Sequence, residues 1–195
     1  ALLGYLRSQG CEDFDFLDLR LWVPSAYVPT YSTCGVFGET YVIDVADLPL
    51  VLQLLENVAH SRSLTPAMDE LFERYCIERG INPHSLYAYL RAMDRFLESF
   101  FAQIGSLEFI GFTVWNSNLL TTLMAAAHLK RRRNPPLIVL GGPQVTESKT
   151  SAKLALRSGL ADFIAQGEGE ETLLQLYEAF REERRVPTRA IPGTM

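Results

Sequence analysis

The amino-acid sequence predicts an α/β protein with a Rossmann-like (flavodoxin-like) parallel sheet and flanking helices. Two observations lead to this prediction. From residue 105 onward, short apolar segments alternate with amphipathic ones, which is typical of parallel strands connected by helices. Before that point, residues 47–104 carry only helical patterns, so we expect a helical insertion there.

The N-terminal residues predict a helix followed by a strand. The opening "ALLGYLRSQG" is amphipathic and closes on Gly10, which is typical of a helix end. Apolar and acidic residues then alternate in "FDFLDLRLW" (Phe14–Trp22), which favours a strand. A parallel sheet of this class normally has a further strand before the first helix, at the centre of the sheet. We therefore expect that this first strand is missing from the sequence.

A loop and three helices are expected next. The segment Val23–Gly38 is rich in Pro, Tyr, Ser, Thr and Gly, which favours a loop. The three helices are predicted over residues 47–58, 65–79 and 83–104. The first two begin with an N-cap residue, Asp47 or Thr65, and carry a proline in the first turn.

Three strand–helix pairs make up the predicted core, residues 105–183. The strands are expected in "LEFIGFTVW" (Leu107–Trp115), "PPLIVLGG" and "LADFIAQGEGEE". The helices are expected in "NSNLLTTLMAAAHLKRRRN", "ESKTSAKLALRSG" and "ETLLQLYEAFREE". Because ligands of such sheets bind outside the carboxyl ends of the strands, the segments "TVWN", "GGPQ" and "GEGE" are the places to look for a site.

Composition argues against several classes of protein. The formal net charge of −5 argues against a nucleic-acid partner, and the basic run Lys130–Arg133 suits the end of a helix. No apolar stretch reaches the roughly 20 residues that a membrane span needs. The cysteines, Cys11, Cys34 and Cys76, lack metal-ligand spacing. We expect free thiols, no bound metal and a cytoplasmic location.

The predicted strand in "PPLIVLGG" ends in two glycines, Gly141 and Gly142. Either the chain needs only a tight turn there, or a ligand approaches the backbone closely. A P-loop is excluded because no Lys-Ser/Thr pair follows at the right distance. Gly111 lies inside the preceding strand, where glycine weakens packing unless something lies close, and this favours the ligand. We expect Thr113, Gly141 and Gly142 to line one crevice.

The segment "GEGEET" differs from a dinucleotide-binding fingerprint, because Thr172 replaces the third glycine. Its acidic residues would also repel a phosphate, whereas without an anion they favour the start of a helix. Trp115 leaves two alternatives open, since it could close the core or stack on a ligand.

No catalytic arrangement is apparent in this chain. The histidines, His60, His84 and His128, have no ligand or catalytic partner at the right spacing. The alternating Asp13, Asp15 and Asp18 suit a solvated strand face. We expect that the isolated chain binds a ligand but does not catalyse a reaction.

Three segments together, "IGFTVWNSNLL", "LIVLGGPQVTE" and "ADFIAQGEGEETLLQLYEAF", resemble the N-terminal cobalamin-binding domain of B12-dependent radical SAM enzymes. The opening helix and strand fit the same domain. The segment "GETYVIDVADLPL" and the helical insertion resemble the branch that acts in maturation of ribosomally made peptides (RiPPs). The resemblance covers most of the chain.

The resemblance implies base-off cobalamin, with its nucleotide tail threaded between sheet and helices. Thr113 would meet the tail, Pro143–Val145 would flank the corrin, and Gly167 to Glu170 would border the tail. Trp115 and Asn116 would sit near the cobalt face. The full set of implied site residues is Gly111, Thr113, Trp115, Asn116, Gly141, Gly142, Pro143, Gln144, Val145, Gly167, Glu168 and Gly169. The DxHxxG motif of B12 mutases and the CxxxCxxC cluster motif are both absent.

The predicted organisation is a single domain, 1–195, with an insertion at 47–104, a core at 105–183 and a linker at 184–195 toward a catalytic domain in cis. The resemblance implies that the full-length protein is a methyltransferase, acting on a peptide or natural product. It would also hold a 4Fe-4S cluster and S-adenosylmethionine, neither bound by this chain. Two alternatives stay open: a cofactor-free flavodoxin- or receiver-like interaction domain, and a nucleotide-binding half-domain.

Overall fold

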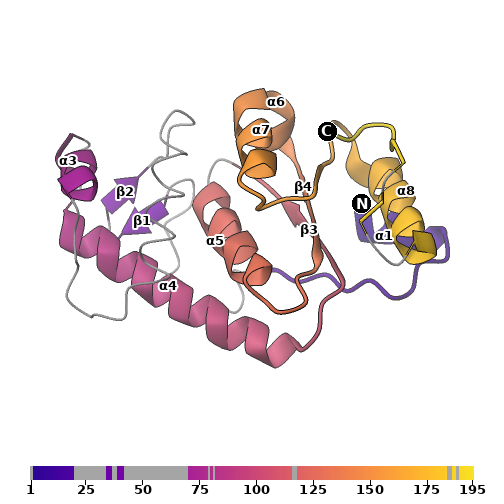
Figure 1. Cartoon of the computed structure of the whole chain (residues 1–195), viewed down its shortest axis with the longest axis horizontal. Coiled ribbons are helices and arrows are strands. Elements are labelled where there is room, and N and C mark those ends of the chain that lie inside the picture. The colour runs from indigo at the N-terminus through magenta and orange to yellow at the C-terminus, as the bar shows by residue number, and fades with distance from the viewer. Residues whose placement is uncertain are drawn as a thin grey trace. The chain divides into compact units, whose positions relative to one another are not determined.

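The computed structural model in Figure 1 describes residues 2–19, 34–36, 39–41, 70–78, 80, 82–115, 118–183, 186–187 and 189–195. The chain divides into two compact units. The sheet unit comprises Ala1–Trp22, Leu107–Trp115 and Arg133–Met195. The helical unit comprises Val23–Ser106 and Asn116–Arg132.

The sheet unit contains a parallel sheet of three strands, β3 (Phe109–Thr113), β4 (Leu137–Gly141) and β5 (Phe163–Ile164). The order is β3-β4-β5, so β4 lies in the middle. Along β3 and β4 the register runs from the pair Phe109↔Leu137 to the pair Thr113↔Gly141. The predicted α/β class with a parallel sheet and flanking helices is confirmed, and the architecture is consistent with a Rossmann-like fold.

Four described helices belong to the sheet unit: α1 (Leu2–Ser8), α6 (Pro143–Glu147), α7 (Lys149–Arg157) and α8 (Gly169–Glu183). The helix predicted in "ESKTSAKLALRSG" corresponds to α7, whereas no helix was predicted over α6. Ser148 separates them, because its backbone is extended (φ −100°, ψ 91°) and its hydroxyl accepts a hydrogen bond from the Ser151 N–H at 3.3 Å. An N-cap serine therefore starts a new helix directly after α6.

The core of the sheet unit forms because β4 is apolar on both faces. Ile138 and Leu140 are fully buried on one face, and Leu137 and Val139 are buried on the other. On the second face, the buried residues form one cluster with residues of α1, α8 and the C-terminal segment, which includes Leu6, Cys11, Leu137, Val139, Ala165, Leu173, Leu176, Tyr177 and Ile191. Helix α8 therefore covers the face of the sheet that carries Leu137 and Val139.

The predicted strand Phe14–Trp22 is wrong over its described part, because residues 14–19 form no ladder with a described strand. Phe14 instead packs its ring against Tyr177, with centroids 4.4 Å apart. The Tyr177 hydroxyl donates a hydrogen bond of 2.8 Å to Asp13 Oδ2. An isolated strand leaves its backbone groups unpaired, and side-chain contacts with α8 and β3 hold the start of this segment instead. Residues 20–22 lie outside the described residues.

The helical unit contains an antiparallel pair, β1 (Cys34–Val36) and β2 (Glu39–Tyr41), and three described helices. These helices are α3 (Glu70–Glu78), α4 (Pro83–Ile104) and α5 (Leu119–Lys130). The bounds predicted for α4 are confirmed. The predicted loop is wrong at Cys34–Val36, where a strand forms by pairing with β2. The helix predicted over 47–58 lies outside the described residues, and so do residues 65–69 and 79.

Candidate functional site

The carboxyl ends of the three parallel strands lie side by side. Thr113, the last residue of β3, pairs with Gly141, the last residue of β4. A Cβ atom placed on Gly141 would lie 3.6 Å from the Cβ of Ala165, which follows β5. The sheet therefore brings three of the segments that the sequence singled out to one edge.

Hydrogen bonds tie the loops at this edge together. The Val114 N–H donates to the Gly141 carbonyl at 2.7 Å, and the Gln144 N–H donates to the Val114 carbonyl at 3.1 Å. The Gly167 N–H donates to Thr146 Oγ1 at 3.3 Å, which joins the loop after β5 to α6. The three loops are thus held by one another and not only by their strands.

Small residues line one face of the sheet at this edge. The strand register places Gly111, Thr113 and Gly141 on the same face as Phe109, which is the face that α8 covers. A Cβ atom on Gly111 would lie 3.8 Å from Leu173 Cδ1 of α8. Gly111 and Thr113 are both exposed. Beside the first turns of α8, the sheet therefore presents an accessible surface of short side chains.

The fold itself requires a residue without a side chain at Gly142. Its backbone has φ 100° and ψ 175°, a conformation that is essentially restricted to glycine. A Cβ atom there would lie 2.8 Å from the Val114 carbonyl oxygen and 2.9 Å from the Val114 nitrogen. The backbone of Val114, directly after β3, thus occupies the space beside Gly142 where we expected a ligand. The tight turn, one of the two explanations left open, accounts for Gly142 without a ligand.

The residues after Gly142 divide between surface and core. Pro143 begins α6, and both Pro143 and Gln144 are half-buried. Val145 is only 1 % exposed, so its side chain belongs to the core. Trp115 is 54 % exposed and therefore does not close the core. Asn116 lies outside the described residues.

The loop after β5 contrasts with the turn after β4. Gly167 has a φ of 74°, and no described atom lies within 4 Å of where its Cβ would stand. Gly169, the first residue of α8, has equally open space around that position. Glu168 is exposed, and Glu170 and Glu171 occupy the first turn of α8, where carboxylates favour the helix dipole. This helix start is therefore unsuited to a phosphate.

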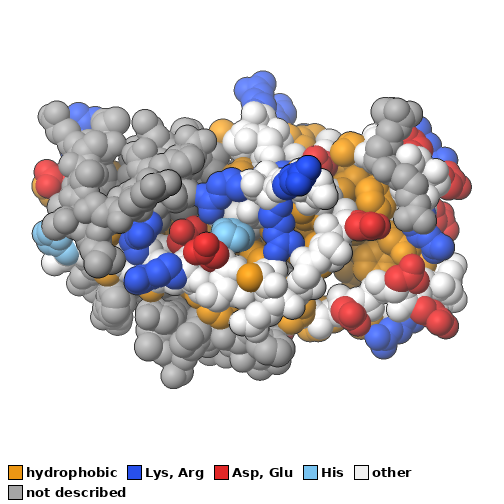
Figure 2. All heavy atoms as spheres, turned by 60° about the horizontal axis from the view of Figure 1, so that its bottom comes forward, with side chains coloured by type: hydrophobic (Ala, Val, Ile, Leu, Met, Phe, Trp, Pro, Cys, Tyr) orange, Lys and Arg blue, Asp and Glu red, His pale blue; other side chains and the backbone are white. Residues whose placement is uncertain are grey.

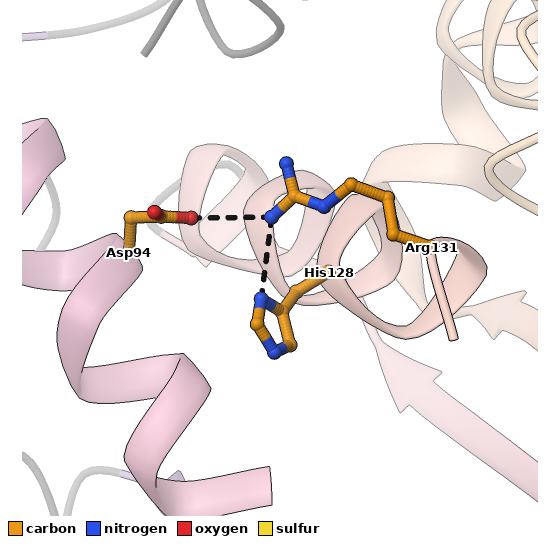
Figure 3. A network of polar contacts seen from close by, with 3 residues as sticks. All are labelled: Asp94, His128 and Arg131. Carbon is orange, nitrogen blue, oxygen red and sulfur yellow. Dashed lines mark hydrogen bonds and ion pairs between the residues drawn. The ribbon is translucent and has the colours of Figure 1, made fainter. Parts of the chain in front are cut away.

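A polar cluster lies in the helical unit (Figure 3). Arg131 Nη2 lies 3.3 Å from Asp94 Oδ1 of α4 and 3.2 Å from His128 Nδ1 of α5. Because a guanidinium only donates, this Nδ1 must accept, which requires a neutral imidazole. Burial, and next the Arg131 charge, lower the pKa of His128. The ring also stacks on Phe101, with centroids 5.9 Å apart.

The contacts of the neighbouring Arg132 indicate that this cluster connects α4 with α5. Its guanidinium donates to the Phe101 carbonyl and, at 2.9 Å, to the Gly105 carbonyl, at the end of α4. It also lies 5.8 Å from the Phe101 ring centroid. The last carbonyls of a helix lack intrahelical donors, so an arginine there caps α4 and fastens it to α5. The basic run predicted to favour its own helix therefore also serves another one.

Other classes of site find little support in the described part of the chain. No cluster of His, Cys, Asp and Glu there could hold a metal ion. Cys11 and Cys76 are both buried free thiols, and burial raises the pKa of Cys76 to about 11. Among the described helices none is long and apolar enough to cross a membrane. Acidic and basic side chains are interspersed on the face in Figure 2, so that face shows no patch of one sign.

Comparisons with known proteins found no match among family models, curated proteins or solved structures. The site is therefore defined by its residues alone. Sequence reasoning missed Thr146, which joins two loops, and Leu173, which faces Gly111. Only the helical spacing of Leu173 signalled a buried face, and nothing signalled its partner in β3.

Proposed function

We propose that the sheet unit is a cobalamin-binding module, the cofactor module of a B12-dependent radical SAM enzyme. The observation that carries the proposal is the accessible surface of Gly111, Thr113 and Gly141 beside the first turns of α8. A parallel sheet binds ligands at its carboxyl edge, and short side chains there leave room for a flat group along the backbone.

The residues at this edge suit cobalamin better than a phosphate-rich nucleotide. The Thr113 hydroxyl and the Gln144 amide can hydrogen-bond to a neutral amide or to a nucleotide tail. Trp115 offers an exposed aromatic surface. Glu168, Glu170 and Glu171 disfavour a free phosphate at α8.

In this proposal Gly111, Thr113 and Gly141 hold the nucleotide tail, and Gly167–Gly169 borders it. Pro143 and Gln144 flank the corrin. Gly142 and Val145 serve the fold, because Val114 fills the space at Gly142 and Val145 is buried. When bound, cobalamin would supply a methyl carrier, which the chain's own residues only place and orient.

The full enzyme in this proposal is a methyltransferase of RiPP maturation. The 4Fe-4S cluster and S-adenosylmethionine would belong to a radical SAM domain in cis, and the methyl acceptor would be a peptide or natural product. The residues 191–195, expected as part of a linker, pair with β5 in the sheet unit.

Binding of hydroxocobalamin tests the proposal directly. The purified chain is mixed with hydroxocobalamin, free ligand is removed by gel filtration, and the visible spectrum is recorded. We expect retained cobalamin with a base-off spectrum. Thr113→Val, which keeps the shape but removes the hydroxyl, should weaken binding about three- to tenfold.

A variant at Gly169 separates binding from folding. Because the space beside Gly169 is open and its φ is not positive, Gly169→Leu should fold and yet block the tail. The matched control is Glu178→Leu, at an exposed position about 13 Å further along α8. Binding lost only in Gly169→Leu supports the site. If the folded wild-type chain retains no cobalamin, the cofactor-free interaction domain becomes the better explanation, with Phe16 (75 % exposed) and Trp115 (54 % exposed) as its contact candidates.

We also propose that the sheet continues beyond the outer edge of β3. The added strand would be the one that this fold class places before the first helix. The register turns the N–H groups of Ile110 and Phe112 toward β4 and those of Phe109 and Gly111 toward the outer edge. No described strand pairs with that edge. In amide hydrogen exchange, Phe109 and Gly111 should exchange much faster than Ile110 and Phe112. Equal protection of all four would show that the edge is already covered, and this proposal would fall.

A further inference from the structure

The C-terminal segment Ile191–Met195, at the end marked C in Figure 1, pairs with β5 in antiparallel orientation. The Ile164 N–H donates to the Met195 carbonyl at 3.1 Å, and the Met195 N–H returns a bond of 3.0 Å to the Ile164 carbonyl. The Gln166 N–H donates to the Gly193 carbonyl at 2.8 Å. The outer edge of β5 is therefore closed by the segment Ile191–Met195.

Side chains fasten the same segment to the core and to α8. Ile191 is 6 % exposed and belongs to the core cluster that includes α8. Thr172, in the first turn of α8, donates its hydroxyl to the Pro192 carbonyl at 3.3 Å. The Thr194 hydroxyl donates to the Ile191 carbonyl at 2.7 Å and closes a turn within the segment. The pairing with β5 is thus supported by independent contacts.

Glycine at position 193 is what allows this close fit. Gly193 has a φ of 75°, which other residues adopt only at a cost. A Cβ atom there would collide with Thr172 Oγ1. A side chain at this position must displace the Thr172 hydroxyl from its hydrogen bond to the Pro192 carbonyl, or push the segment away from α8 or from β5.

We propose that the segment Ile191–Met195 is a positioning element for the loop Gly167–Gly169 of the candidate site. Gln166, which the segment holds, is the residue directly before Gly167. Fixing Ile164 and Gln166 sets the direction in which the chain leaves β5, and this decides where the loop lies beside α8. The effect on the loop stands on the contacts above, whereas the effect on cobalamin rests on the proposed function.

Gly193→Ala tests the effect on the loop by amide hydrogen exchange. Exchange should accelerate at Ile164 and Gln166, whose bonds to the segment are lost. It should also accelerate at Gly167, whose partner, Thr146 Oγ1, lies outside the segment. The matched control is Gly159→Ala, because Gly159 has a similar φ of 71° but no described atom within 4 Å of its Cβ position. The control carries the same backbone cost and should leave exchange at Gly167 unchanged.

Cobalamin affinity provides the functional readout. Gly193→Ala should weaken binding about tenfold, because the loop is no longer preorganised. Gly159→Ala should change it less than about twofold, since the loop is intact. Adding Thr172→Ala removes the colliding hydroxyl, so the double variant should regain protection at Gly167 and part of the affinity. The double variant also serves if Gly193→Ala alone fails to fold.

The outcomes distinguish this inference from the proposed function. Unchanged exchange at Gly167 in folded Gly193→Ala overturns the positioning role, even if cobalamin binds. Faster exchange at Gly167 in a chain whose wild type retains no cobalamin supports the positioning of the loop and overturns the proposed function. Faster exchange with unchanged cobalamin affinity shows that the loop does not contribute to binding, and the functional half of the inference falls.

Discussion

The turn after β4 and the loop after β5 both present glycines at the same edge of the sheet, but for different reasons. At Gly142 the backbone of Val114 occupies the space where a side chain would stand, at 2.8 and 2.9 Å. At Gly167 and Gly169 that space is open among the described residues. The first glycine is required by packing, Gly167 by its backbone angle, and Gly169 by neither. An unexplained glycine is thus a better pointer to a ligand than a conspicuous pair.

The same contrast changes which variant reports on binding. Substituting Gly142 disturbs the fold before it disturbs any ligand, so lost binding there would say nothing about a site. Substituting Gly169 leaves the packing unchanged. The four predictions below test this contrast. They run from the variant with the largest expected effect on stability to the one with the smallest.

Gly142→Ala should have the largest effect. The added Cβ meets the Val114 nitrogen and oxygen, and φ 100° with ψ 175° is unfavourable for alanine. Overpacking and backbone strain together should lower the free energy of unfolding by about 2–5 kcal/mol. Urea denaturation measures the change. The control is Gly141→Ala, whose Cβ would make an ordinary 3.6 Å contact with Ala165. Equal losses in both variants would contradict the close approach at Gly142.

Gly167→Ala should cost about 1 kcal/mol, because only its φ of 74° opposes a side chain. Gly167→Asn should cost less, since asparagine tolerates the left-handed conformation. The same denaturation experiment compares the two variants. A loss from Gly167→Ala as large as that from Gly142→Ala would mean that the loop is packed as tightly as the turn.

Thr146→Val probes the bond that joins the two regions. It removes the oxygen that accepts the Gly167 N–H at 3.3 Å and keeps the side-chain shape. We expect a loss of about 0.5 kcal/mol and faster exchange of the Gly167 amide. Unchanged exchange at Gly167 would show that this contact does not hold the loop.

Much of the fold could be predicted because its determinants are local. Helix α4 has the predicted bounds because Pro83 starts it and its apolar face repeats at helical spacing. Strand β4 is identified by a run of apolar residues that are buried on both faces. In contrast, the segment from Phe14 alternates like a strand but pairs with no described strand, and pairing depends on distant residues that its own sequence does not encode.

The candidate site was predictable only in outline. The position of Gly141 at the carboxyl end of a strand follows from local pattern and from the general rule for parallel sheets. The reason for Gly142 does not, because Val114 lies on a different strand end and only the three-dimensional register brings it close. The "IPGT" segment carries the Pro and Gly of a turn, but nothing in it signals that it pairs with β5.

Gly169→Ala should have the smallest effect, and in the opposite direction. No described atom opposes a Cβ at Gly169, and alanine favours a helix over glycine by roughly 1 kcal/mol in a helix interior. Since Gly169 is the first residue of α8, we expect only part of that gain, about 0.3 kcal/mol. Denaturation of Gly169→Ala should therefore show equal or slightly higher stability. A clear loss would reveal packing at this position, and Gly169→Leu would then no longer separate binding from folding. With stability preserved, an effect of Gly169→Leu on cobalamin can be assigned to the open space beside α8.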